Sequence, residues 1–220
     1  QSVYVNNNGN LSFGAAYATY TRSGFPIDDF PMIAPFWGDV DTGSAANPTG
    51  AVWMKFFDGN GDGIDDTLVV TWDNVGYYDE KGDLRNTFQV VISDGTSNLV
   101  GIGINVCFSY DKMCWTTGDA SNGTMGLGGS PATVGGNAGD GVDFFLIGRF
   151  DQQGTAYDGP EGMNDGVEFL DGQTFCFTTD DMNNVAPIAN VLGANKVIVN
   201  AASASSLDEI ITFNSPEAFQ

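Results

Sequence analysis

Apolar and polar residues alternate over short segments of this chain, and glycine, asparagine and aspartate separate those segments. Residues 3–5 and 11–13 alternate on either side of residues 6–10, which predicts a strand, an Asn/Gly turn and a second strand. Residues 51–57 and 67–73 are rich in β-branched and aromatic side chains, so both are predicted as strands. The period of two in these segments indicates a β protein.

The remainder of the chain continues this pattern. Further strands are predicted over residues 87–93, 99–110, 144–150 and 173–178, and loops over residues 75–83, 119–141 and 151–171. We therefore expect an all-β fold, a largely antiparallel β-sandwich with long Gly/Asp-rich loops and little helix. The expected core comprises Val5, Phe13, Ile33, Phe36, Trp37, Trp53, Val70, Trp72, Phe88, Val90 and Phe145.

The segment 30–42 combines large apolar side chains with two prolines and an acidic end. Pro31 and Pro35 lack a backbone donor and disfavour helical geometry in the residue before them, so the segment is predicted to be extended. Phe36 and Trp37 are adjacent and would point to opposite faces of a strand. Both faces of this segment should therefore be covered.

Four motifs resemble, in this order, the nidogen-like (NIDO, or entactin) extracellular domain. They are VYVNNNGNLSFG at 3–14, IAPFWGDVD at 33–41, VTWDNVGYY at 70–78 and NTFQVVI at 86–92. The resemblance covers about residues 1–178, so we divide the chain into a nidogen-like domain at 1–181 and a C-terminal extension at 182–220. It implies a secreted or cell-surface structural or adhesive module that acts through protein or matrix contacts.

The chain is strongly acidic and contains no histidine. Its 28 acidic and 7 basic residues give a net charge of −21, which disfavours nucleic acids and anionic membranes as partners. Without histidine there is no Ser-His-Asp triad, Cys-His pair or His-ligated zinc. A carboxylate-dependent extracellular hydrolase would need two converging acids, and no pair is marked by its spacing. We therefore expect a protein that is not an enzyme.

The most specific local motif is an acidic loop between two predicted strands. Asp58, Asn60 and Asp62 occupy positions one, three and five of the segment DGNGDGIDD, Gly63 follows at position six, and Asp66 stands at position nine. Oxygen ligands on alternate residues, with glycines that let the chain curl, suit a hard cation such as Ca²⁺.

The predicted Ca²⁺ ligands are Asp58, Asn60, Asp62, the carbonyl group of Ile64, and Asp66. A full EF-hand loop has glutamate at position twelve, where this chain has Val69, so a further ligand must come from Asp65 or a neighbouring loop. The alternative is a metal-free Asp/Gly turn, because both residue types favour turns. Asp39 and Asp41 allow a second cation site, with Asp28 or Asp29, but we favour a role in capping turns.

Three cysteines leave several pairings open. Cys107 could pair with Cys114 across a turn near residues 111–112, or with Cys176 in the last strand of the family-like region. Three free thiols are the remaining alternative. An odd number leaves at least one thiol free or paired outside the chain.

The extension at 182–220 differs in composition from the rest. It contains two apolar runs, at 196–200 and 207–213, which need to be buried. They could form an edge strand on their own domain, or they could add a strand to a neighbouring copy and so build a filament. The chain begins at Gln1 and has no apolar run of membrane-spanning length, so we expect a removed signal peptide or a trimmed sequence and no membrane insertion.

Overall fold

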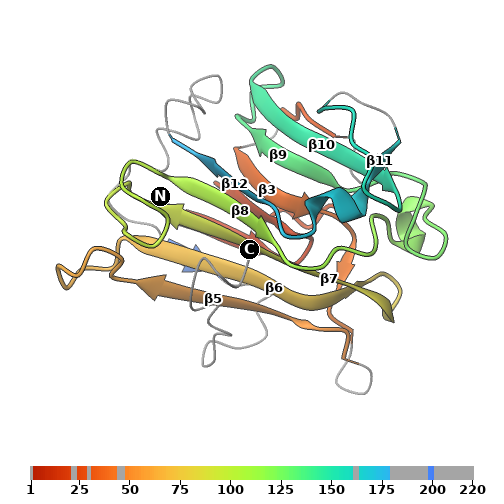
Figure 1. Cartoon of the computed structure of the whole chain (residues 1–220), viewed down its shortest axis with the longest axis horizontal. Coiled ribbons are helices and arrows are strands. Elements are labelled where there is room, and N and C mark those ends of the chain that lie inside the picture. Colours follow the sequence, from red (N-terminus) through yellow and green to blue (C-terminus); the bar gives the residue numbers. More distant parts are fainter. Residues whose placement is uncertain are drawn as a thin grey trace.

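Two β-sheets packed face to face form the fold in a computed structural model, as the alternating pattern predicts (Figure 1). The structure describes residues 2–20, 24–28, 31–43, 48–160, 164–178 and 198–200. Phe30 and Asp29, and the apolar run at 207–213, lie outside these residues. The helical segments of the described part are two short 3-10 turns, and neither could cross a membrane.

The first sheet has the strand order β11-β10-β9-β3-β2-β1-β13. Its strands are β1 (Ser2–Asn6), β2 (Asn10–Phe13), β3 (Met32–Trp37), β9 (Thr133–Asn137), β10 (Phe144–Gln152), β11 (Asp165–Gly166) and β13 (Ile198–Asn200). Neighbours are antiparallel except for the pairs β1–β13 and β10–β11. Of the C-terminal extension, the described part is β13, and it lies at the edge of its own domain.

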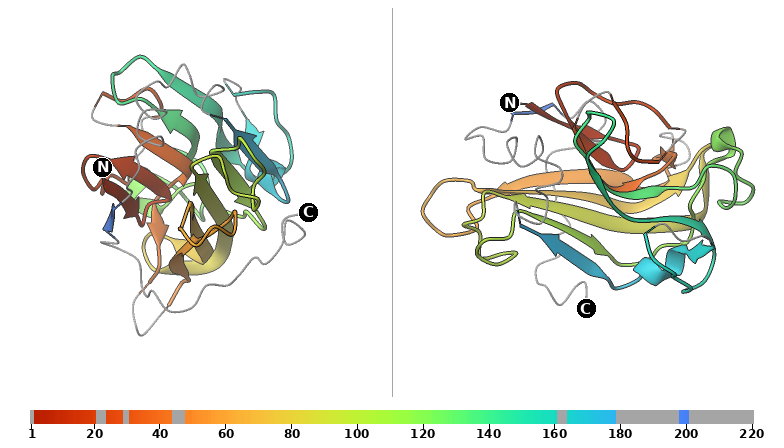
Figure 2. Two further views of the ribbon diagram at one scale, coloured as in Figure 1. Left: turned by 90° about the vertical axis from the view of Figure 1, so that its left-hand side faces the viewer. Right: turned by 90° about the horizontal axis from the view of Figure 1, so that it is seen from above.

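The second sheet has the order β12-β8-β7-β6-β4, and β5 also pairs with β6. Its strands are β4 (Val40–Asp41), β5 (Ala51–Phe57), β6 (Thr67–Tyr77), β7 (Lys81–Ser93), β8 (Val106–Tyr110) and β12 (Thr174–Phe177). All these pairs are antiparallel. The two 3-10 turns are η1 (Asp119–Ser121) and η2 (Val167–Leu170), and Figure 2 shows the sheets from two further directions.

Aromatic side chains fill the space between the sheets. Trp72 stacks on Phe88 with ring centroids 5.0 Å apart, and Phe36 contacts both Phe88 and Trp115. The Trp72 indole also donates a 2.9 Å hydrogen bond to the carbonyl of Asn7, in the turn between β1 and β2. This bond ties the second sheet to the first at the centre of the core.

Strand β3 is covered on both faces, as its sequence predicts. Phe36 belongs to the core between the sheets, whereas Trp37 packs in a second cluster with Ile27, Met32 and Ala34. The expected core residues are buried with two exceptions. Phe145 is half-buried against the core, and Trp53 is half-buried outside it, because the alternation along β5 turns Val52 inward instead.

Several sequence-based boundaries are wrong. The predicted loop at 75–83 is the end of β6, a tight turn and the start of β7, and the predicted strand at 99–110 begins only at Val106. The predicted loop at 119–141 contains the buried strand β9, and the one at 151–171 contains β11 and η2.

A disulfide joins Cys107 on β8 to Cys176 on β12, directly across the two antiparallel strands. Cys114 is the free cysteine, so the alternative of three free thiols and the pairing with Cys114 are both wrong. Asp41 accepts hydrogen bonds from the backbone of Gly43 and Glu80, which is the turn-capping role that we favoured.

Candidate functional site

The acidic loop 58–66 projects from one end of the second sheet, between β5 and β6 (orange in Figure 1). The Asp58 carboxylate accepts backbone hydrogen bonds from Gly61, Asp62 and Gly63, at 2.6, 3.0 and 2.7 Å. Asn60 and Asp62 each accept a bond from the backbone two residues further on. The loop therefore curls around its first carboxylate, as the alternation of acids and glycines requires.

Asp66 closes the loop from its other end. Its carboxylate accepts backbone bonds from Gly59 and Asn60 and a side-chain bond from Thr67. Burial acts to raise the pKa of Asp66, but these hydrogen bonds outweigh it, and the pKa lies below its usual value. The neighbouring loop 94–105 adds a bond between Asn60 and Thr96.

The structure thus brings the predicted cation ligands into one loop, although their oxygens already accept hydrogen bonds. A carboxylate offers about four acceptor sites. Asp58 uses three of them, whereas Asp62 has a single hydrogen bond, from the backbone of Ile64. Across the described residues, no group of three or more acidic or cysteine side chains gathers as a metal site would require. A Ca²⁺ ion here would depend on Asp62, carbonyl oxygens and water.

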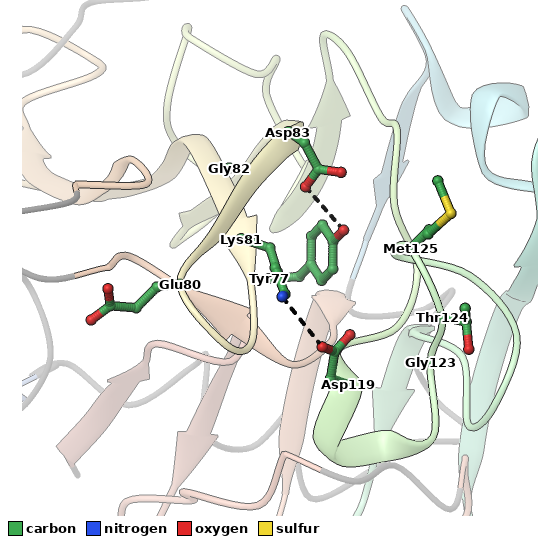
Figure 3. A pocket seen from close by; sticks show the side chains of 9 residues that line it. All are labelled: Tyr77, Glu80, Lys81, Gly82, Asp83, Asp119, Gly123, Thr124 and Met125. Carbon is green, nitrogen blue, oxygen red and sulfur yellow. Dashed lines mark hydrogen bonds and ion pairs between the residues drawn. The ribbon is translucent and has the colours of Figure 1, made fainter.

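A second site, an open recess of about 600 Å³, lies at the opposite end of β6. Its walls come from the β6–β7 hairpin and from the segment that contains η1 (Figure 3). The lining includes Tyr77, Glu80, Lys81, Asp83, Asp119, Thr124 and Met125. Residues separated by about forty positions in the chain meet here because the hairpin folds against the η1 segment.

Acidic groups dominate the recess. The Tyr77 hydroxyl donates a 3.0 Å hydrogen bond to Asp83, and the Lys81 ammonium lies 3.7 Å from the Asp119 carboxylate. Burial, followed by the bond to Asp83 and the nearby acidic charges, raises the pKa of Tyr77 to about 12. Asp83 and Asp119 lie on either side of Tyr77 and the single ammonium group of Lys81, whereas the Glu80 side chain points away from them (Figure 3). Negative charge therefore exceeds positive charge in the recess, which suits a positively charged ligand.

The sequence does not predict this recess, because residues 75–83 and 119–141 both have the composition of loops. The tyrosine and the acids of 77–83 carry no spacing that distinguishes them from a turn. Nothing in the sequence indicates that residues 119–125 return to this hairpin.

Comparison with known proteins agrees with the fold. The model of the nidogen-like domain family matches residues 1–61 and 54–164. Alpha-tectorin of Gallus gallus and of Mus musculus are each 35% identical over an alignment of 166 residues, and the match covers 67% of this chain and 8% and 7% of those proteins. Nidogen of Drosophila melanogaster is 28% identical over 58% of this chain and 10% of its own length. No solved structure matches.

The chain therefore corresponds to a small part of the curated relatives that it matches, and it belongs to the nidogen-like domain family.

Proposed function

We propose that this chain is an extracellular structural module that acts by binding other macromolecules and not by catalysis. Its family membership and its similarity to segments of alpha-tectorin and nidogen support this proposal. The disulfide between Cys107 and Cys176 supports it independently, because disulfides persist in oxidising compartments. The absence of histidine removes the commonest general base.

The observation that carries the binding proposal is the acidic recess. Glu80, Asp83 and Asp119 line it together with the Tyr77 ring and Met125, which is 73% exposed. Carboxylates attract a cationic side chain, and apolar groups can pack along its aliphatic part. We therefore propose that the recess receives a lysine or arginine side chain of a partner protein.

A labelled hexalysine peptide provides a direct test at low salt. The double variant D83N/D119N is expected to bind it about two- to thirtyfold more weakly than the wild type, because each of the two exposed ion pairs is worth roughly 0.2–1 kcal/mol. The matched control is D65N/D111N, which removes the same charge at exposed positions that do not line the recess. Equal weakening in both variants would mean that only net charge is being measured, and the recess proposal would be wrong.

We also propose that loop 58–66 binds Ca²⁺ and that the ion stabilises the module. Thermal unfolding in CaCl₂ and in chelator should differ, with a gain of about 2.7 kcal/mol when free Ca²⁺ exceeds its Kd a hundredfold. The variant D62N keeps the oxygen that accepts the Ile64 backbone bond but removes the charge, so it should require more Ca²⁺ for the same gain. Identical Ca²⁺ titrations of D62N and of the control D111N would contradict this site.

The alternative function is that of a repeating subunit in an extracellular filament. One observation favours it: within the described residues β5 pairs only with β6, and its Phe56 is exposed, so its outer edge could accept a strand from another copy. The segment 207–213 is our proposed donor. Light scattering of the full chain beside a chain that ends at Asp181 separates a filament subunit from a module that binds other proteins.

A further inference from the structure

A buried acidic cluster lies in the loop that joins β10 to β11, away from both sites described above. The two strands run parallel, with Phe150 opposite Asp165, so Asp151 and Asp165 come from neighbouring backbone segments. Asp158, midway along the loop, donates a 3.0 Å backbone hydrogen bond to Oδ1 of Asp165. Of three acids spaced seven residues apart, Asp158 and Asp165 are thereby joined, and Asp151 lies on the neighbouring strand segment.

Asp165 is the centre of this cluster. Its side chain is fully buried, with 0% exposure, and its Oδ2 atom has no hydrogen-bond partner. The Asp158 side chain acts on the Asp165 carboxyl group through its charge, and two ionised carboxylates are both acceptors and form no bond with each other. Asp151 accepts a bond from the backbone of Asn164 with one oxygen, while its other oxygen is buried and has no partner.

The negative charge of this cluster needs compensation. A buried carboxylate with one unpartnered oxygen is costly unless a cation or a proton neutralises it. The ion pairs among the described residues are Lys81–Asp119 and Lys112–Asp171, and neither involves these acids. Arg149 acts on Asp151 through its charge, but its guanidinium bonds Ser130 and the carbonyl of Pro131.

We propose that Asp158 and Asp165, with Asp151 beside them, bind a divalent cation of the Ca²⁺ type. The described acids do not gather in a tight group of three, so carbonyl oxygens and water must complete the shell. Ca²⁺ accepts such mixed oxygen shells, whereas Mg²⁺ demands near-ideal octahedral geometry. Asp158 is exposed while Asp165 is buried, so the ion can enter from solvent and reach the unpartnered oxygen. With so few carboxylates, we expect a Kd of about 10⁻⁴–10⁻³ M, as in extracellular modules.

The proposal is independent of loop 58–66, and the variant D165N tests it on the full chain. Asparagine has the shape of aspartate and provides an N–H donor toward Asp158, so D165N should melt at or above the wild-type temperature in chelator. In CaCl₂ at a hundredfold excess over Kd, the wild type should melt about 5 °C or more higher. Part of this rise comes from Ca²⁺ in loop 58–66 and should be reduced in D62N. The other part comes from the Asp165 site and should be lost in D165N but kept in D62N.

Isothermal titration with CaCl₂ separates the two sites. D165N should lose one binding event that D62N keeps, and the control D111N should behave as the wild type. If D165N does not fold, D158N replaces it, because Asp158 is exposed and its backbone bond to Asp165 is unaffected by the change. An unchanged titration in D165N or D158N would overturn the proposal. The proposal would also be overturned if CaCl₂ did not raise the melting temperature of the wild type and D165N were more stable than the wild type. That result would indicate a proton shared by the carboxyl groups of Asp158 and Asp165.

Discussion

Replacing both Cys107 and Cys176 by alanine is expected to lower the free energy of unfolding by about 4 kcal/mol, if the cross-link acts by restricting the unfolded chain. The disulfide closes a segment with a sequence separation of 69, and loop-closure entropy grows with the length of the closed segment. The bond also holds β12, whose hydrogen-bonded neighbour in the second sheet is β8. Phe175 and Phe177 on this strand pack against the core, so its loosening would expose apolar surface.

Urea unfolding followed by tryptophan fluorescence measures this loss. The matched control is C114A, because Cys114 is the free cysteine and forms no cross-link. C114A should unfold within about 1 kcal/mol of the wild type, and a reducing agent should destabilise the wild type and C114A but leave the double variant unchanged. A double variant as stable as C114A would show that the sheets alone hold β12 in place.

The general architecture could be predicted because the alternation of apolar and polar residues is a local signal. The strands around the Asn/Gly turn, and the pair β5–β6 on either side of the acidic loop, follow directly from it. The prolines indicate that the segment of β3 is extended, and its adjacent apolar residues Phe36 and Trp37 must then point to opposite faces. The prediction that both faces of β3 are covered is confirmed. Each of these inferences uses residues close together in the chain.

Two strand segments were missed because their glycines serve close packing and not turns. In β9, a Cβ atom on Gly135 would lie 2.2 Å from the carbonyl oxygen of Phe145, so this position requires glycine. The glycines of this strand are the reason that the sequence predicts a loop here. At the end of β6, a Cβ on Gly76 would lie 2.0 Å from the carbonyl oxygen of Lys81. Glycine in a strand often marks such a close approach, but composition alone cannot separate it from a loop.

The candidate sites follow the same rule. The ligand set of loop 58–66 is contiguous and could be proposed from spacing. The recess depends on how distant segments pack, and the cluster of Asp151, Asp158 and Asp165 depends on how the loop between β10 and β11 folds. The acidic segment 151–171 was visible in the sequence, but its composition alone does not indicate that Asp165 is fully buried. Burial is what turns an ordinary surface acid into a candidate ligand.

Truncating Trp72 to alanine is expected to cost about 3–5 kcal/mol, the usual range for a buried tryptophan. Its side chain is fully buried, stacks on Phe88 and donates the hydrogen bond to the carbonyl of Asn7. The variant W72F separates these contributions, because phenylalanine can keep the stacking but removes the indole bond and leaves the Asn7 carbonyl with its bond from the backbone of Gly9. A typical hydrogen bond contributes about 0.5–1.5 kcal/mol, so W72F should fall between the wild type and W72A.

Trp53 provides the matched control for this measurement, because it lies on the adjacent strand β5 but is only half-buried and outside the main core. W53A should cost clearly less than W72A in urea unfolding, since less apolar surface is buried at that position. W53F and W72F should differ as well, because Trp72 donates a hydrogen bond to the β1–β2 turn of the first sheet and Trp53 lies outside the main core. Equal losses for W53A and W72A would mean that the contact between the two sheets contributes little to stability, contrary to the central place of Trp72 in the core.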